Sequence, residues 1–186
     1  MGLRPLGYRD AAQWRAVRAR NVAWLEPWEA TNPHVAGPVP GYYAMVRMFR
    51  AEALRGRMLP FVVTYRGRLV GQLTVGGITL GSLRSAYIGY WVDQAVAGRG
   101  IMPTAVAMAT DHCFTQLGLH RVEVNIRPEN ANSRRVAEKL GFRDEGVRRF
   151  YLHIDGAWRD HVSYALTRED VPDGLLARWR RAKHGE

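Results

Sequence analysis

The turn Gly98-Arg99-Gly100 carries the residue types that point most directly to chemistry. It follows residues 85–92, which are dense in aromatic and β-branched side chains, and it precedes apolar residues at helical spacing. A strand that passes through small residues directly into a helix aims several free backbone N–H groups at one point, beside the positive end of the helix dipole. Glycine lets an anion approach that backbone, and Arg99 adds a charge-assisted contact. The pattern predicts a pyrophosphate site, and the simpler alternative is an ordinary strand-to-helix turn.

Two familiar nucleotide motifs do not match this turn. It lacks the Lys-Ser/Thr pair of a P-loop. It also lacks the third glycine and the acidic residue about 20 positions further on that a dinucleotide-binding fold requires. These two classes of nucleotide site are therefore excluded.

Four stretches together resemble the GNAT acetyltransferases. Residues 95–100 resemble their coenzyme A pyrophosphate motif, Gln/Arg-x-x-Gly-x-Gly/Ala, with Ala95 where the family usually has Gln or Arg. Residues 130–142 resemble the Asn-x-x-Ser…Leu-Gly-Phe segment that flanks the pantetheine arm and the thioester in the RimJ/RimL branch. Residues 151–161 resemble the final hairpin of ribosomal-protein-alanine N-acetyltransferases of the RimJ type, and residues 21–29 match that branch as well. The resemblance spans nearly the whole chain.

The resemblance implies an acetyl-CoA-dependent N-acetyltransferase in which a primary amine attacks the thioester directly. It implies a single GNAT domain of residues 1–186, an α+β fold with a central mixed, mostly antiparallel sheet and helices on both faces. In this family the strand at 85–92 splays from the strand at 120–127, and the pantetheine arm lies in the gap. The implied cofactor-binding residues are Trp91, Val92, Ala97, Gly98, Arg99, Gly100, Ile101, Met102, Asn130 and Ser133.

The acid and base groups depart from the family pattern. Many GNAT enzymes have a tyrosine as general acid three residues before the leucine of the Leu-Gly-Phe segment, and Ala137 occupies that position. Ser133 is the replacement candidate, because the serine of this segment approaches the sulfur in RimL-like enzymes. Its alternative role is to support the helix N-terminus. The glutamate proposed as base in RimL-like relatives falls at Leu152 and does not carry over.

Two loop acids, Glu26 and Glu29, are the candidates for the base or for binding the substrate ammonium. A carboxylate at either position can bind a peptide N-terminus and relay its proton through water, and the alternative is a solvated loop acid. Trp28 and Tyr90 complete the candidate acceptor site, with a place in the core as the alternative for Trp28. His120 is a further candidate. Structural roles are expected for the polar residues of the final hairpin, His153, Asp160 and His161.

The acceptor stays open among three classes. The RimJ type implies the N-terminal amine of a ribosomal protein that begins with alanine. The same scaffold also serves small-molecule amines, such as antibiotics or metabolites. The net charge of +10 suggests a polyanionic partner, so the third class is a ribosome- or RNA-associated factor with a vestigial coenzyme A site. Arginine as a merely solvating residue is the alternative account of that charge. A monomer and a homodimer are both compatible with the sequence.

The composition indicates a folded protein outside the membrane. The chain has 186 residues, 47% of them hydrophobic, which suffices for one domain with its own core. No apolar run approaches the roughly 20 residues of a membrane span, and no apolar signal core follows Met1, so we expect a cytoplasmic protein. The lone Cys113 excludes an internal disulfide and a zinc cluster, and its apolar helix face predicts a buried thiol. The six histidines are not spaced as metal ligands, so no metal is expected.

Periodicity predicts the elements that must position these residues. Helical spacing predicts a helix over 10–20 that Asp10 caps, and a second helix over 42–55. The core positions of the second are Met45, Met48, Phe49 and Leu54. The helix after the glycine turn ends at Gly118, the next is capped by Asn130 or Asn132, and a short basic helix lies near the C-terminus. The predicted strands are 59–65, 69–78, 85–92, 122–126, 146–154 and 161–166.

Overall fold

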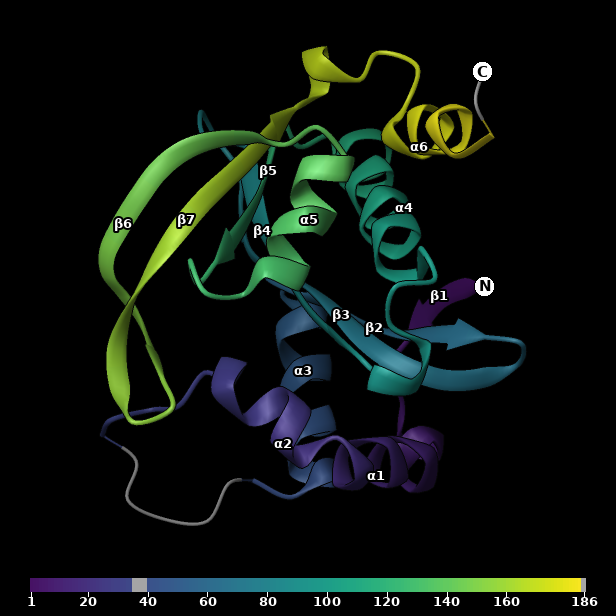
Figure 1. Ribbon diagram of the computed structural model, residues 1–186, viewed down its shortest axis with the longest axis vertical. Helices are drawn as coiled ribbons and strands as arrows, with labels where there is room; N and C mark the ends of the chain where they lie inside the picture. Colours follow the sequence, from purple (N-terminus) through teal and green to yellow (C-terminus); the bar gives the residue numbers. More distant parts are fainter. Residues whose placement is uncertain (35–39, 185–186) are drawn as a thin grey trace.

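The structure, a computed structural model, describes residues 1–34 and 40–184 (Figure 1). Its strands are β1 (Gly2–Pro5), β2 (Leu59–Tyr65), β3 (Arg68–Thr79), β4 (Ser85–Val92), β5 (Arg121–Ile126), β6 (Arg143–Ile154) and β7 (Ala157–Thr167). Its helices are α1 (Ala11–Arg20), α2 (Val22–Leu25), α3 (Tyr42–Leu54), α4 (Ile101–Thr115), α5 (Ala131–Lys139) and α6 (Leu175–His184). Short 3₁₀ turns lie at Tyr8–Asp10, Glu26–Trp28, Gln94–Val96 and Arg168–Asp170.

The strands form a seven-stranded sheet in the order β1-β2-β3-β4-β5-β7-β6. Neighbouring strands are antiparallel except β4 and β5, which run parallel. The predicted mixed, mostly antiparallel sheet is therefore confirmed. The β4–β5 ladder pairs only residues 85–87 with 121–123. Among the residues that the structure describes, the rest of β4 consequently has no strand partner on the side that faces β5, which is the splay that the resemblance implies.

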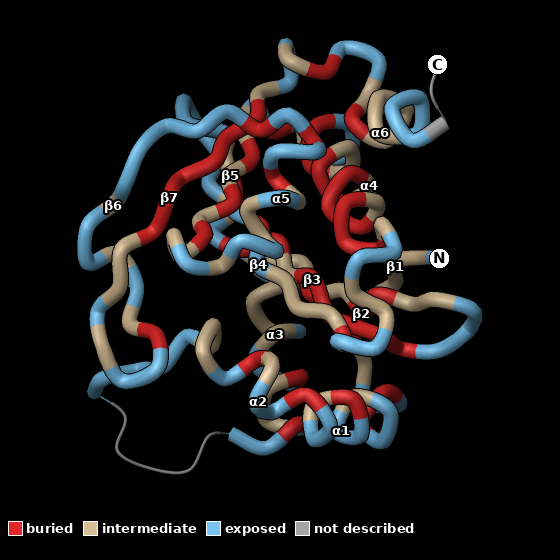
Figure 2. The backbone as a smooth tube through the Cα atoms, in the orientation of Figure 1, coloured by how far each residue is buried: buried red, intermediate tan, exposed pale blue. Residues whose placement is uncertain are grey.

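Helices cover both faces of the sheet, as expected. Side chains that alternate along β2 and β3 divide between two cores, because successive side chains of a strand point to opposite faces. Val62 and Leu69 pack with residues of α1 and α3, whereas Val63 and Val70 pack with residues of α4. Figure 2 shows the resulting pattern, with buried segments in the central strands and α4 and exposed segments around them.

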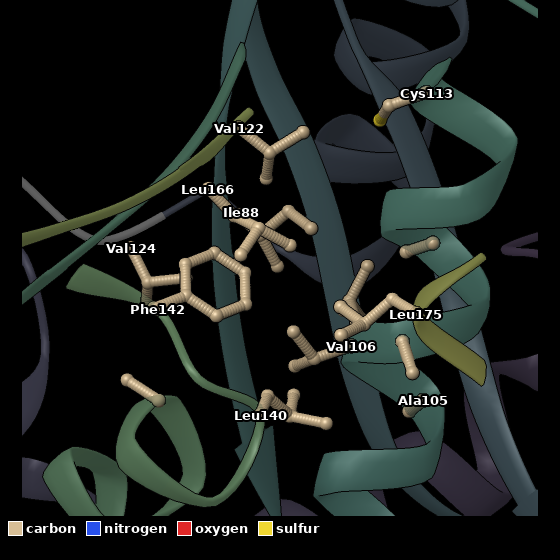
Figure 3. Packing of buried hydrophobic residues seen from close by; sticks show 14 of the residues in the cluster. Ile88, Ala105, Val106, Cys113, Val122, Val124, Leu140, Phe142, Leu166 and Leu175 are labelled. Carbon is tan, nitrogen blue, oxygen red and sulfur yellow. The ribbon is translucent and has the colours of Figure 1, made fainter. Parts of the chain in front are cut away.

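The larger core lies between the sheet and the helices α4 and α6 (Figure 3). Ile88 of β4, Val106 of α4, Leu166 of β7 and Leu175 of α6 are each at most 2% exposed. Cys113 is fully buried among them, and burial raises the pKa of its thiol to about 12. The prediction of a buried thiol is confirmed. This core fixes the position of α4 against β4, and so the position of the glycine turn between them.

The helix α3 is rotated relative to the prediction. Its buried residues are Tyr42 and Val46, while Met48 is 53% exposed and Leu54 is 90% exposed. The expected core positions of the last two were therefore wrong. The Tyr42 hydroxyl donates a hydrogen bond of 2.7 Å to the carbonyl of Gly7, which fixes the first turn of the helix with Tyr42 inward. Val46 then follows four residues later on the same face.

Candidate active site

A cavity of about 880 Å³ extends from the N-terminus of α4 along the diverging strand β4 to the segment after α2. Because α1, α2, β3, β4 and α5 all contribute to its lining, it joins the two regions that the sequence assigned to cofactor and acceptor. Glu26 and Arg99 lie outside this lining. The predicted site residues that line it are Trp28, Glu29, Tyr90, Trp91, Val92, Ala97, Gly98, Gly100, Ile101, Met102, Asn130 and Ser133.

The glycine turn has a left-handed backbone at both glycines, with φ of 77° at Gly98 and 76° at Gly100. Other residues rarely adopt this conformation, so glycine is required at both positions. Gly100 is the N-cap residue of α4, and the amides of Ile101 and Met102 in its first turn have no partner inside the helix. Pro103 follows them and has no N–H group to leave unpaired. The turn offers free backbone donors, and its glycines have no side chains of their own, which fits a pyrophosphate.

The buried carboxylate of Asp93 fixes the start of the turn. It accepts hydrogen bonds from Asn21 Nδ2 at 2.9 Å and from the Ala95 amide at 3.3 Å, and it forms an ion pair of 2.5 Å with Arg20. Burial works against ionisation of Asp93, but these partners lower its pKa below the usual value. Asn21 also accepts a hydrogen bond of 2.9 Å from the Gln94 amide. The end of α1 is thereby joined to the end of β4, a role that the sequence analysis did not assign to either side chain.

The helix α6 supports the other end of the turn. The indole of Trp179 donates a hydrogen bond of 2.9 Å to Thr104 Oγ1, which in turn donates one of 2.8 Å to the carbonyl of Gly100. Arg99, by contrast, is exposed and donates a bond of 3.3 Å to the Ala95 carbonyl. The turn is therefore held through its backbone. The contact of the Arg99 side chain with a phosphate stays a prediction.

The unpaired side of β4 is bordered by Trp24 of α2. Its indole N–H donates a hydrogen bond of 3.1 Å to the Val92 carbonyl. In a strand the N–H and C=O of one residue point to the same side, so the bond marks the side of β4 on which Val92 has no strand partner. Trp24 also lines the cavity. It thus limits the gap at the end of β4, and nothing in its sequence context had indicated this.

The N-terminus of α5 places a serine and a tyrosine together. The Asn130 side chain accepts a hydrogen bond of 3.1 Å from the Ser133 amide, so Asn130 is the cap that the sequence left open between two asparagines. The capping role considered for Ser133 thus belongs to Asn130, and the Ser133 residue lines the cavity. The Tyr90 hydroxyl donates a hydrogen bond of 3.3 Å to the Ser133 carbonyl. Burial raises the pKa of Tyr90, which keeps this hydroxyl protonated.

The acceptor end of the cavity contains an ion pair between Arg18 and Glu29. The Arg18 guanidinium lies 5.5 Å from the ring centroid of Trp14 and 5.5 Å from that of Trp91. Trp14 is itself held by a hydrogen bond of 2.8 Å from its indole to Gln72 Oε1. Of these residues the sequence analysis proposed only Glu29 for the acceptor, because contacts between α1 and β3 leave no local pattern in the sequence.

The segment that carries Glu29 is fixed by an arginine from the end of β5. Arg127 donates a hydrogen bond of 2.8 Å to the Pro27 carbonyl and lies 5.4 Å from the ring centroid of Trp28. Glu26, in the 3₁₀ turn Glu26–Trp28, is exposed, whereas Glu29 follows the turn with extended backbone and reaches the cavity. Of the two loop acids, only Glu29 is therefore placed to meet an acceptor.

The histidines considered in the sequence analysis, His120, His153 and His161, lie outside the cavity lining. His120 forms an exposed contact of 3.0 Å with Glu169. His153 exchanges a hydrogen bond of 2.6 Å with Thr31, and the buried His161 contacts the Arg159 carbonyl at 3.0 Å. Burial is the main cause that lowers the pKa of His161. These contacts agree with the structural roles expected for His153 and His161 and leave His120 without a partner in the site.

A splayed sheet, a glycine turn at a helix N-terminus and a cavity that runs from one into the other define an acyl-coenzyme A transferase. The family model described as an acetyltransferase (GNAT) domain matches residues 1–143. The chain belongs to the GNAT acetyltransferase family and is an acetyl-CoA-dependent N-acetyltransferase.

The relatives agree with the RimJ/RimL branch. The solved structure of Mycobacterium smegmatis RimJ in complex with CoA-disulfide has a TM-score of 0.92 and 47% sequence identity, and the match covers 98% of this chain and 88% of that one. The "Probable N-acetyltransferase YjcK" of Bacillus subtilis strain 168 is 32% identical, over 90% of this chain and 94% of that protein. The ribosomal protein uS5-alanine N-acetyltransferase of Escherichia coli strain K12 is 31% identical, over 89% of this chain and 87% of that protein.

The residues of the cavity fit coenzyme A. The pyrophosphate has the backbone donors of the glycine turn, and the pantetheine arm has the unpaired edge of β4 beside it. Arg135 and Lys139, one turn apart on α5, also line the cavity. Neither forms an ion pair with a described residue. They place positive charge where a phosphorylated ligand would lie, and the sequence analysis did not identify them.

Within residues 1–34 and 40–184 no three side chains of the histidine, cysteine, aspartate or glutamate types gather as a metal site would require. No helix in this described part combines the length and the hydrophobicity needed to cross a lipid bilayer.

Proposed function

We propose that this enzyme acetylates the N-terminal α-amine of a protein, with a ribosomal protein as the acceptor. The supporting observation is the charge of the acceptor end. Glu29 is the acidic residue of the cavity lining, and it is already paired with Arg18. A polycation, such as an aminoglycoside or a polyamine, requires several unpaired acids, whereas one peptide N-terminus brings a single ammonium. The names of the Escherichia coli and Mycobacterium smegmatis relatives favour the same class of acceptor.

The cofactor end is formed by the glycine turn and α5. Acetyl-CoA supplies an activated acetyl group as a thioester. The amides of Gly100, Ile101 and Met102 bind the pyrophosphate, and the strand edge at Trp91 and Val92 positions the pantetheine arm. The predicted contacts of Ala97, Gly98 and Asn130, which line the cavity, and of Arg99, which lies outside its lining, are part of the same proposal.

Proton transfer in the proposed reaction uses both ends of the cavity. Glu29 binds the ammonium of the acceptor and takes its proton through water. Ser133 Oγ passes its proton to the sulfur that leaves and regains one from the nitrogen of the tetrahedral intermediate, so that no alkoxide remains. The Tyr90 hydroxyl, through its bond to the Ser133 carbonyl, holds the first turn of α5 in place for this transfer. Trp28 lines the cavity beside the acceptor. Glu26 is exposed outside the cavity lining, so it is a candidate only for contact with a part of the acceptor that lies outside the cavity.

The proposal is tested with purified protein, acetyl-CoA and a panel of acceptors, by following the release of free thiol. The panel contains peptides with N-terminal alanine or serine, intact ribosomal proteins, an aminoglycoside and spermidine. We expect release with the peptides or ribosomal proteins, and mass spectrometry should locate the acetyl group on the first residue. Transfer to the aminoglycoside or to spermidine alone would replace a protein acceptor with a small molecule. No transfer to any amine, with tight binding of RNA that weakens steeply with salt, would indicate the RNA-associated factor instead.

We also propose a domain organisation, an oligomeric state and a cellular location for the enzyme. We propose one catalytic domain over residues 1–186, monomeric or homodimeric, that works in the cytoplasm, where ribosomal proteins are made. The net charge of +10 supports contact of its surface with ribosomal RNA. Sedimentation at increasing salt, with and without ribosomes, tests that contact.

A further inference from the structure

Arg18 is held in the cavity independently of its acidic partner. Its guanidinium lies 5.5 Å from the ring centroids of both Trp14 and Trp91, at a distance typical of cation–π contacts. The Trp14 indole is fixed by its bond to Gln72, and its ring packs against Tyr42 at 5.2 Å between centroids. The side chain of Arg18 is 26% exposed, and the residue lines the cavity. Two rigid rings therefore orient this guanidinium toward the space where the acceptor binds.

The guanidinium has more donors than its partner can use. Arginine carries five N–H groups, and a carboxylate engages at most two of them in a bidentate pair. Within residues 1–34 and 40–184, the contact of Arg18 with Glu29 is its one polar side-chain partner. Donors therefore remain for an oxygen atom of a ligand in the cavity. A ligand that used both residues would need a cation for Glu29 and a neutral oxygen acceptor close to it for Arg18.

An α-amino acyl group has these two features. In a peptide N-terminus the ammonium nitrogen and the carbonyl carbon are bonded to the same Cα, so the cation and the carbonyl oxygen lie side by side. A lysine side chain and a polyamine have an ammonium without a carbonyl beside it. Resting on the function proposed above, we propose that Arg18 and Glu29 recognise the acceptor together. Glu29 accepts from the ammonium, and Arg18 donates to the carbonyl oxygen of the first peptide bond.

This recognition explains why an arginine stands in a site for amines. A positive charge beside the acceptor opposes the binding of a second cation and so disfavours polyamines. The Arg18 guanidinium does not attract the ammonium of the acceptor. Its contribution is a charge-assisted hydrogen bond to the carbonyl oxygen. Specificity for α-amines over side-chain amines follows from this single contact.

The test compares two acceptors that differ only at the first peptide bond, since one of them lacks its carbonyl oxygen and its N–H group. The first is a tetrapeptide with N-terminal alanine, and the second is its alkene isostere, in which a trans carbon–carbon double bond replaces the first amide. For the wild-type enzyme we expect kcat/KM to be about 10- to 100-fold higher with the amide, the range expected of one hydrogen bond to a charged group. Equal kcat/KM for the two acceptors would overturn the inference and leave the proposed function intact. No transfer to either would overturn both.

Variants assign the preference to Arg18. R18M should use both acceptors at similar rates, and R18K should keep part of the preference through its single ammonium. The control is R15M, because Arg15 is on the same helix and lies 5.2 Å from the ring centroid of Tyr43, outside the cavity lining. R15M should keep the wild-type preference. Circular dichroism and coenzyme A affinity verify that each variant is folded, and an unchanged preference in folded R18M would refute the role of Arg18.

Discussion

A methyl group at Gly98 separates the role of this glycine in folding from its role in binding. Gly98 has φ of 77° and lines the cavity, and a Cβ atom built on it meets no other heavy atom within 4 Å. The substitution G98A therefore causes no clash in the free enzyme. Its cost is the left-handed backbone, about 1–2 kcal/mol for a residue with a side chain. For a chain of this size that cost lowers Tm by about 2–8 °C.

The matched control is Gly67 in the turn between β2 and β3. Its φ is 76°, a Cβ atom there also meets nothing within 4 Å, and it lies outside the cavity lining. G67A should therefore show the same loss of Tm with unchanged coenzyme A affinity. In G98A the methyl group comes between the backbone and the pyrophosphate, so we expect at least tenfold weaker binding, about 1.4 kcal/mol.

Calorimetric titration of coenzyme A and thermal melts with and without ligand measure both quantities. At a ligand concentration of 100 Kd for the wild type, bound coenzyme A adds about 2.7 kcal/mol of stability, and a tenfold weaker Kd removes about half of it. The ligand-induced rise in Tm should therefore shrink in G98A and stay constant in G67A. Wild-type affinity in G98A would show that the phosphates do not approach the backbone at this glycine, and the proposed turn would have to be abandoned as their binding site.

Three further predictions concern the groups around the turn. S133A should lower kcat by about 100-fold or more while the Kd of coenzyme A stays the same, and unchanged kcat in steady-state assays would remove Ser133 from proton transfer. W179F deletes the donor to Thr104 Oγ1 while it keeps an aromatic ring, so coenzyme A affinity should fall a few-fold with circular dichroism unchanged; affinity equal to wild type would contradict the support by α6. The folded-state pKa of Asp93 is lowered, so its contribution to stability is present above the unfolded pKa of about 3.9 and is lost as the pH falls through the folded value. D93N should accordingly have a lower free energy of unfolding than wild type at pH 7. In acid denaturation profiles the difference in this free energy between the two proteins should narrow below a pH of about 4. A difference that stays constant with pH would argue against the ionised Asp93 carboxylate as the source of the stability.

The sequence predicted the elements that local patterns specify. The strands predicted over 59–65 and 85–92 have the observed bounds, because an aromatic and β-branched run bounded by turns has few other solutions. The glycine turn was found for a similar reason, since its function needs two glycines between a strand and a helix. Asp10 shows the limit of local patterns. It occupies the N-cap position of α1, but its carboxylate accepts from the Gly7 amide and pairs with Arg4, so it fixes the approach to the helix instead of capping it.

The acceptor end was harder to predict because its residues meet only in three dimensions. Arg18 lies on α1 and Glu29 follows the 3₁₀ turn Glu26–Trp28, whereas Trp91, whose ring contacts Arg18, lies on β4 in the centre of the sheet. Each has an ordinary local context, an arginine on a helix or an acid in a loop. Their shared role depends on the packing of α1 against β3 through Trp14 and Gln72, a contact between residues 58 positions apart.

The position of the family tyrosine on α5 differs in this chain. The family tyrosine position on α5 holds Ala137, which is 1% exposed and faces the core, so a tyrosine there would require a different packing of α5. A phenol hydroxyl nevertheless reaches the first turn of α5, from Tyr90 on the strand that α5 faces across the cavity. Because the Tyr90 hydroxyl donates its hydrogen bond to the Ser133 carbonyl, we propose that it positions the serine and that Ser133 Oγ is the proton donor. Y90F should thus lower kcat less than S133A does, since it loosens a turn of helix without deleting the proton that is transferred.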